Sequence, residues 1–259
     1  MVTLTLLEKI YGPEEDEALR SFQNFLSSFS SGLEAEVKIV GKTEKGWVQV
    51  DVSGSDTVVV TNYLSQKFGL APVSLENLKV PSELGGRVVD SGRVGYGLYV
   101  DVGISSPQVV DVLIPLHVLR RQFVGDKKLS TRKIIEDFCL YDNFPLRIKL
   151  TRINMDKKEI EAELSEDQLA TFQNWLSLGF DRVIALGASL ELIRYALERS
   201  GSTRDVIRVD KLGFLEYSLL CKLGTEAPGI INRLGHLLPR IPLHAFMSRK
   251  IKTLLELEK

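Results

Sequence analysis

Residues 85–104 read GGRVVDSGRVGYGLYVDVGI, a β-rich run in which Tyr96 and Tyr99 stand three positions apart with Gly97 between them. Side chains of a strand alternate between its two faces, so residues three apart point to opposite sides. Either one tyrosine is buried, or Gly97 marks a bulge that turns both rings to the same face. We favour the bulge, which would expose both rings. The inward residues of this strand are then Leu98, Val100 and Val102.

The strands around this run predict a small barrel. Between residues 85 and 164, five short strands alternate with turn signals, a pattern typical of a five-stranded OB-type barrel. Ser165 and Gln168 have the spacing of a capping box at the start of the next helix, which ends the barrel segment. The five predicted strands cover residues 86–92, 97–103, 109–116, 145–153 and 159–165.

The segment before the barrel predicts a β-α-β-β-α module. It opens with the strand VTLTLL, and apolar residues at helical spacing from Ala18 to Phe29 predict a helix. Two strands at 34–42 and 46–54 follow, joined by a hairpin turn, and a short helix ends near Gly69. The stretch 71–84 contains two prolines and has little periodicity, which indicates a linker.

The segment after the barrel predicts a second α+β module. A strand at 181–188, a helix capped by Ser189, two strands, a helix, a strand and a terminal helix follow one another. The order β-α-β-β-α-β is that of the ferredoxin-like fold, and its first five elements repeat the order of the N-terminal segment. We therefore expect a multidomain α+β protein in which the barrel is flanked by two similar modules. The predicted domains cover residues 1–80, 81–165 and 166–259.

Composition excludes several classes of protein. The chain has 259 residues, is 44% hydrophobic and carries a net charge of −1, which is typical of a soluble globular protein. Cys139 and Cys221 lie far apart and are expected to be reduced structural thiols. Three scattered histidines predict no metal site, and no apolar run reaches the ~20 residues of a membrane span. We expect a cytoplasmic protein without cofactor, metal or membrane contact.

The barrel segment resembles the S-one RNA-binding domain, named after the ribosomal protein that repeats it. Gly86 and Val88 match the family's opening strand, and Leu164-Ser165 matches its closing one. An aromatic-glycine-small-aromatic-valine signature is matched at 96–100. The chain departs from the family pattern at Val112 and Pro115, where a glycine and a histidine are usual, and at His117, where serine is frequent. The resemblance implies a five-stranded OB barrel whose two aromatics and nearby cations bind RNA bases.

The flanking segments carry a second resemblance. The stretch RDVIRVDKLGFLEYSLLCKLGTEAPG, residues 204–229, is similar to an uncharacterised, largely archaeal family that carries such a barrel. No activity follows from this second resemblance.

The residues themselves support RNA binding. Exposed tyrosines would stack bases for ~1–3 kcal/mol each, with little sequence preference. Arg93 precedes the tyrosines, and Arg147 and Lys149 share one face of the fourth strand, where they would contact phosphates. The run RRQFVGDKKLSTRK at 120–133 holds six cations and one acid, and it is either a solvated loop or a phosphate clamp. The secondary cationic patch consists of Arg120, Arg121, Lys127 and Lys128.

The sequence thus predicts a non-enzymatic protein that binds single-stranded or ribosomal RNA in translation, on the ribosome or in RNA metabolism. We find no catalytic triad order and no phosphate-loop spacing. The alternative is a regulatory scaffold whose barrel contacts protein. In that case the helix start at 225–231, with its APG sequence, would bind a small anion. The other interpretation of this helix start is an ordinary helix cap.

Overall fold

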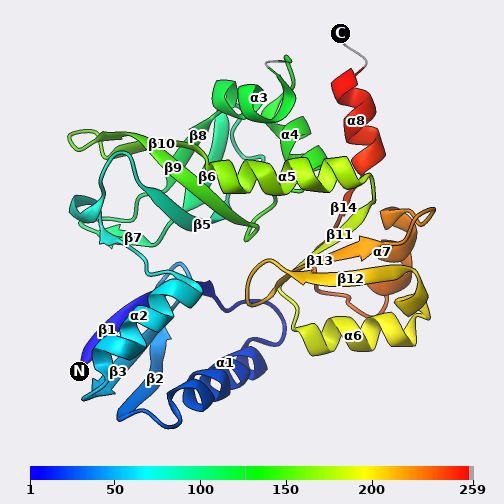
Figure 1. Ribbon diagram of the computed structural model, residues 1–259. Helices are drawn as coiled ribbons and strands as arrows, with labels where there is room; N and C mark the ends of the chain where they lie inside the picture. Colours follow the sequence, from blue (N-terminus) through cyan, green and yellow to red (C-terminus); the bar gives the residue numbers. More distant parts are fainter. Residues whose placement is uncertain (126, 257–259) are drawn as a thin grey trace.

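The computed structural model describes residues 1–125 and 127–256, and it contains three modules, of which the middle one is a closed barrel (Figure 1). In the N-terminal module, an antiparallel sheet of order β1-β3-β2 is covered by two helices. Phe22 and Leu26 of the first helix and Val60 and Leu64 of the second pack on the valines of the central strand. The elements are β1 (Val2–Lys9), α1 (Glu15–Ser30), β2 (Ala35–Lys42), β3 (Trp47–Gly54) and α2 (Thr57–Phe68).

The predicted linker is an ordered connection between this module and the barrel. After α2 the backbone runs along the free edge of β1, where Leu7 N donates to Gly69 O (3.1 Å) and Ala71 N donates to Thr5 O (2.9 Å). It then forms β4 (Val73–Ser74) and the short 3₁₀ helix η1 (Leu75–Asn77), whose Leu75 is buried in the barrel core. Backbone hydrogen bonds and the buried side chain of Leu75 hold this segment in place. It therefore needs no regularly spaced apolar residues, and its sequence shows none.

The predicted five-stranded barrel is confirmed. Its strands close in the order β10-β8-β6-β5-β9, and the inward residues predicted for the second strand are buried. A short additional strand, β7 (Ile104–Ser106), pairs in parallel with β4 outside the barrel. The barrel strands are β5 (Glu83–Val89), β6 (Gly97–Asp101), β8 (Val112–Pro115), β9 (Pro145–Asn154) and β10 (Glu159–Leu164).

The bulge predicted at Gly97 is wrong. β6 begins at Gly97 and pairs with β8 in regular register from Gly97↔Pro115 to Val100↔Val112. A Cβ on Gly97 would lie 2.5 Å from the carbonyl oxygen of Ile114, so the glycine permits a close approach of the two strands. Tyr96 lies in the bend before the strand and is therefore not bound by the alternation of β6.

The basic run is helical at both of its ends. α3 (Leu116–Val124) and α4 (Thr131–Phe138) contain Arg120, Arg121, Arg132 and Lys133, Lys127 and Lys128 lie in the connection between the helices, and the apolar faces of the helices close the barrel core. Ser130 caps α4 by accepting a hydrogen bond from Lys133 N (3.2 Å), and Gly125 ends α3 in the left-handed region at φ 59°. The buried residues of the two helices are Val118, Leu119, Phe123, Val124, Ile134, Ile135 and Phe138.

The ferredoxin-like module is confirmed. Its antiparallel sheet has the order β12-β13-β11-β14, and the part β11-β13-β12 repeats the order β1-β3-β2 of the N-terminal sheet. The predicted cap at Ser165 forms, but Gln168 Oε1 accepts from Arg147 N (3.0 Å) instead of completing a capping box. The elements are α5 (Glu166–Leu178), β11 (Arg182–Leu186), α6 (Leu190–Arg199), η2 (Ser202–Arg204), β12 (Val206–Lys211), β13 (Glu216–Cys221), α7 (Ala227–Gly235), β14 (Leu243–Phe246) and α8 (Ser248–Glu256).

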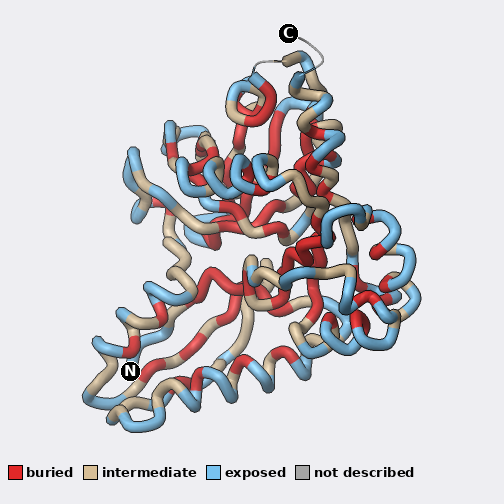
Figure 2. Tube along the Cα trace, turned by 45° about the vertical axis from the view of Figure 1, so that its right-hand side comes forward, coloured by how far each residue is buried: buried red, intermediate tan, exposed pale blue. Residues whose placement is uncertain are grey.

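The modules share their hydrophobic cores. Both faces of β11 are buried: Val183 and Ala185 face α6 and α7, whereas Ile184 and Leu186 belong to the barrel core. Leu215 of the C-terminal module packs in the core of the N-terminal one. Figure 2 shows buried segments where the three modules meet. Within the described residues, we find no helix with the length and apolarity of a membrane span.

Candidate nucleic-acid interface

Tyr96 and Tyr99 lie together on the outside of the barrel. Tyr96 is 57% exposed and Tyr99 is half-buried, and their hydroxyl oxygens are 2.9 Å apart. The ring centroids are 6.3 Å apart with an interplanar angle of 85°, so the two rings form an open corner. The hydrogen bond to Tyr96, together with partial desolvation, raises the pKa of Tyr99 to about 12. Tyr99 therefore presents a neutral aromatic ring at physiological pH.

The bend that carries Tyr96 is hydrogen-bonded to the starts of both α3 and α4. Tyr96 O accepts from Leu116 N at the start of α3 (2.8 Å), and Gly95 O accepts from Thr131 Oγ1 at the start of α4 (2.7 Å). These bonds fix the backbone of the bend from residues 20 and 36 positions further along the chain. The ring of Tyr96 is thus exposed, while hydrogen bonds hold its backbone in place. This arrangement is suited to stacking a planar ligand.

Two exposed arginines lie near the tyrosines. Arg93 is in the β5–β6 turn, with its side chain 75% exposed and 3.2 Å from Asp90. Arg132 follows Thr131 directly, so the bond from Thr131 to Gly95 brings it to the same end of the barrel; its partner is Glu136 (3.0 Å). Sequence reasoning did not single out Arg132, because the contact between α4 and the bend cannot be seen in local spacing.

Most of the secondary cationic patch serves intrachain contacts. Arg120 Nε donates to Leu129 O (2.7 Å), and Arg121 pairs with Glu163 (2.9 Å). Lys127 Nζ donates to Leu254 O (2.9 Å) and Leu255 O (2.7 Å) at the end of α8. Lys128 is exposed. Arg120 and Arg121 thus connect α3 to the following loop and to β10, and Lys127 connects that loop to α8, which is a structural role.

Arg147 and Lys149 lie away from the tyrosines. Tyr99 pairs with Val89 on one edge of β5, whereas Arg147 pairs with Gly85 on the other edge, so four positions of β5, or about 13 Å, separate them along the strand. Lys149 stands directly opposite Glu83 on β5 and Glu163 on β10. Arg93 thus lies in the turn just before the tyrosine pair, whereas Arg147 and Lys149 lie on another part of the barrel.

The N-terminal module covers the outer face of β6 beyond Tyr99. Asp101, two positions on, is buried and accepts hydrogen bonds from Trp47 Nε1 (2.9 Å) and Lys9 Nζ (2.7 Å). Burial lowers the pKa of Lys9, while Asp101 opposes this shift. Because this part of the strand is occupied by protein, the surface open to a ligand is confined to the tyrosine end of the barrel.

A buried charge network joins the three modules beside this contact. Arg87 Nη2 of β5 lies 2.6 Å from Glu8 Oε2 of β1 and 3.4 Å from Glu216 Oε2 of β13. Tyr11 donates from its hydroxyl to Glu216 Oε1 (2.8 Å). Burial raises the pKa of Glu216 to about 7, with Arg87 opposing the shift and Glu8 adding to it. Two carboxylates thus share one guanidinium in the interior.

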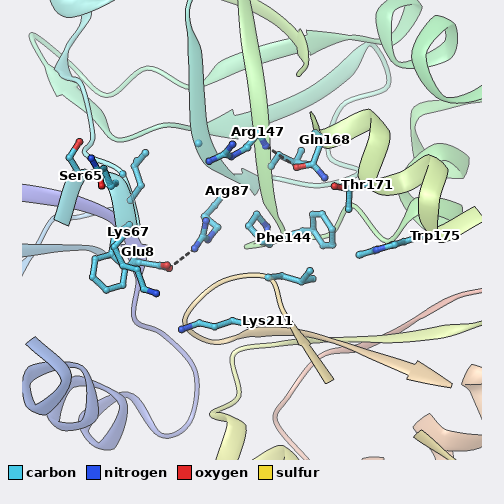
Figure 3. A pocket seen from close by; sticks show the side chains of 18 residues that line it. Glu8, Ser65, Lys67, Arg87, Phe144, Arg147, Gln168, Thr171, Trp175 and Lys211 are labelled. Carbon is cyan, nitrogen blue, oxygen red and sulfur yellow. Dashed lines mark hydrogen bonds and ion pairs between the residues drawn. The ribbon is translucent and has the colours of Figure 1, made fainter. Parts of the chain in front are cut away.

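A cavity of about 440 Å³ lies next to this network, at the junction of all three modules (Figure 3). Lys67 enters its lining from the end of α2, Arg147 from β9 and Lys211 from the end of β12. Gln168 and Thr171 of α5 supply polar groups on the opposite side, beside Trp175. Sequence reasoning missed this cavity, because its walls come from segments that are far apart in the chain.

The helix start at 225–231 is capped within the chain. Ala227 N donates to Asp181 Oδ2 (3.2 Å), so a carboxylate of the protein holds the position that an anion would take. Both cysteines are buried, and burial raises the pKa of Cys221 to about 11, which leaves it a protonated thiol. Among the described residues, no group of three His, Cys, Asp or Glu side chains is arranged to bind a metal.

These features define a three-module α+β protein with a central five-stranded barrel, an exposed aromatic pair and a cationic junction cavity. The chain belongs to the DUF2110 family. The models of the DUF2110 N-terminal, central and C-terminal domains match residues 1–74, 78–176 and 180–241. A search of curated proteins returns no match.

Solved structures offer a weak likeness. The chain matches one in the crystal structure of an a/eIF2alpha–aDim2p–rRNA complex from Pyrococcus horikoshii OT3, with 15% sequence identity and a TM-score of 0.25. The match covers 48% of this chain, which spans 64% of the length of the other. A match at this level assigns neither a fold nor a function.

Proposed function

We propose that this protein binds single-stranded RNA on the tyrosine end of an S-one-type barrel, without catalysis. The observation that carries the proposal is the corner formed by Tyr96 and Tyr99, one ring 57% exposed and both hydroxyls in mutual contact. The signature GYGLYV, in which the two tyrosines resemble the stacking aromatics of the S-one family, supports it further. Such a protein would act in translation, on the ribosome or in RNA metabolism.

The proposed binding mode is short and sequence-tolerant. Each base stacked on a tyrosine contributes ~1–3 kcal/mol, and every base has a face that can stack. Because Asp101 and its neighbours are covered by the N-terminal module, a strand cannot continue along the outer face of β6. We therefore expect about two stacked bases, with affinity in the micromolar to millimolar range unless further contacts add to it.

Arg93 and Arg132 are the proposed phosphate contacts next to the stacked bases. Both side chains are at least three-quarters exposed, and their ion pairs with Asp90 and Glu136 are weak surface pairs that a phosphate can displace. Lys128 lies in the loop just before α4 and extends the same patch. With few phosphates neutralised, the affinity should fall with salt, but less steeply than for a strongly basic protein.

The test is a titration of a fluorescently labelled single-stranded RNA into the wild type and into the double variant Tyr96→Ala/Tyr99→Ala, at two salt concentrations. We expect the double variant to bind at least about tenfold more weakly. The variant Arg93→Ala should bind more weakly at low salt and have a shallower salt dependence.

The matched control is Tyr195→Ala, which removes a tyrosine of similar exposure (53%) from α6 of another module. It should bind RNA like the wild type. Wild-type binding that is absent or insensitive to the tyrosine substitutions would overturn the proposal. A protein partner captured through the tyrosine surface in the absence of RNA would favour the scaffold alternative instead.

A further inference from the structure

The junction cavity gathers positive charge from three separate modules. Lys67, Arg147 and Lys211 line it, and each lies on a different module. Among the described residues that line it, Glu8 is the single acid, and its carboxylate is already engaged by Arg87 at 2.6 Å. The free positive charge in the cavity is therefore not balanced by the protein itself.

These three side chains are available to a ligand. Within the described part of the chain, Lys67 and Lys211 form no ion pair, and Lys211 Nζ lies 5.4 Å above the ring of Phe214. Arg147 is 67% exposed in its side chain, and its nearest carboxylate, Asp167, is itself exposed at 3.7 Å. Figure 3 shows Lys67, Arg147 and Lys211 arranged around the opening from different sides.

Bringing like charges together opposes the packing of the modules. Like charges repel one another near a protein surface, and the repulsion falls as their separation grows. A bound anion offsets this repulsion, because it attracts the cations that line the cavity. A half-enclosed site of one sign of charge also concentrates counter-ions of the opposite sign.

The rest of the lining favours a phosphate ester over a simple ion. The volume of about 440 Å³ is in the range of small-molecule sites, ~300–1,000 Å³, and far exceeds the size of one phosphate. Phe68 and Trp175 supply apolar wall, and Gln168 and Thr171 supply donors and acceptors. An arginine matches the geometry of phosphate oxygens with two parallel hydrogen bonds.

We propose that the junction cavity binds a nucleotide-sized ligand that carries a phosphate monoester, with the cations that line it, Lys67, Arg147 and Lys211, as the groups that attract its negative charge. The same chemistry is presented by a free mononucleotide and by the 5′-phosphate end of an RNA strand. The site is separate from the tyrosine pair, and it does not depend on the stacking function proposed above.

The experiment measures binding of pyrophosphate and of uridine 5′-monophosphate to the full chain by calorimetry, with thermal unfolding as a second readout and sodium chloride at equal ionic strength as the reference. Wild type should bind both probes. Lys211→Ala and Arg147→Ala should each bind about tenfold more weakly, as expected for the loss of one charge-assisted contact. Without ligand, these variants should unfold at or above the wild-type temperature, since repulsion is relieved.

The matched control is Lys157→Ala, an exposed lysine in the β9–β10 turn, which should leave binding unchanged. Tyr96→Ala/Tyr99→Ala should also leave it unchanged, so this site and the stacking site can fail independently. A trinucleotide with a 5′-phosphate that binds more tightly than its 5′-hydroxyl form, and more tightly than the mononucleotide, identifies an RNA end; binding of the mononucleotide but of neither trinucleotide identifies a free nucleotide. Equal binding of both trinucleotides would overturn recognition of the phosphate monoester. No binding of either probe at millimolar concentration, or equal weakening by Lys157→Ala, would overturn the proposal.

Discussion

At the scale of single residues, Gly97 is decisive for the barrel. It contributes no bulge; it lets β6 approach β8, since an added Cβ would lie 2.5 Å from Ile114 O and 2.6 Å from Leu113 Cδ1. The Ile114 oxygen belongs to the backbone of the paired strand and cannot move freely, whereas Leu113 Cδ1 is the end of a side chain that can shift. We therefore expect Gly97→Ala to lower the free energy of unfolding by about 1–3 kcal/mol in urea denaturation.

Gly95 provides the control for this prediction. It lies two positions earlier in the same bend, and a Cβ there meets nothing within 4 Å. Gly95→Ala should leave the unfolding free energy within about 0.5 kcal/mol of the wild type. Equal stability of both variants would mean that the approach of β6 and β8 is not limiting.

The tyrosine pair shows what can be read from a short stretch and what cannot. The alternation of GYGLYV correctly places Tyr99 outward and Leu98 inward. The exposure of Tyr96 was predicted for the wrong reason, because where a strand begins depends on its long-range partners. Here the bend before β6 is fixed by Thr131 and Leu116, and no local pattern encodes these contacts.

At the scale of elements, the sequence analysis did not predict the helices α3 and α4, although the sequence contains helix-forming patterns there. Ile134, Ile135 and Phe138 have helical spacing, and Ser130 is a favourable N-cap. Both helices are short, and six cations in the stretch 120–133 outweigh the apolar pattern. The long predicted elements such as α1, the barrel strands and the ferredoxin-like order were correct because each has a sustained period.

Lys127 tests the structural role of these cations. Its ammonium group donates to two carbonyls in the last described turn of α8. Lys127→Ala should therefore loosen α8 by about 1 kcal/mol, seen as roughly fivefold faster amide hydrogen exchange in that helix.

The exposed neighbour Lys128 is the matched control for this change. Lys128→Ala should leave exchange in α8 as in the wild type. RNA affinity should be the same for Lys127→Ala as for the wild type at low salt. A loss of RNA affinity with unchanged exchange in α8 would instead make Lys127 a phosphate contact.

At the scale of the whole molecule, the junction of the modules could not be predicted from the sequence. Arg87, Glu8 and Glu216 come from three modules and are separated by 79 and 129 positions. Each looks like an ordinary charged residue in a strand, and burial is imposed by the packing of modules rather than by local pattern. The same holds for the cavity beside them. In the sequence, the cations that line it, Lys67, Arg147 and Lys211, look like ordinary exposed residues of separate elements.

Glu216 makes the stability of this junction depend on pH. In the unfolded chain its carboxyl has the ordinary pKa of 4.5, and burial raises it to about 7 in the folded protein. The folded state therefore holds the proton between these values, so its contribution to stability is full below pH 4.5 and is lost as the pH rises through 7. Ionised Glu216 is disfavoured by burial and by Glu8, whereas Arg87 partly compensates it.

The substitution Glu216→Gln isolates this effect. The amide cannot ionise but can still accept from Tyr11, so the variant should lack the loss of stability between pH 5 and 8 that Glu216 causes, on the order of 2–3 kcal/mol. The free energy of unfolding of the variant should therefore increase relative to that of the wild type as the pH rises across this range. His244, whose pKa burial lowers to about 4, changes stability in the opposite direction, but it is common to both proteins and cancels in the difference.

Urea unfolding at a series of pH values measures this difference, with Glu198→Gln on the exposed surface of α6 as the control. The control should follow the wild type at every pH. A constant difference between Glu216→Gln and wild type would mean that Arg87 keeps Glu216 ionised throughout, with one guanidinium balancing both carboxylates. A difference that grows with pH would mean that the three modules are held together most firmly when this carboxyl carries its proton.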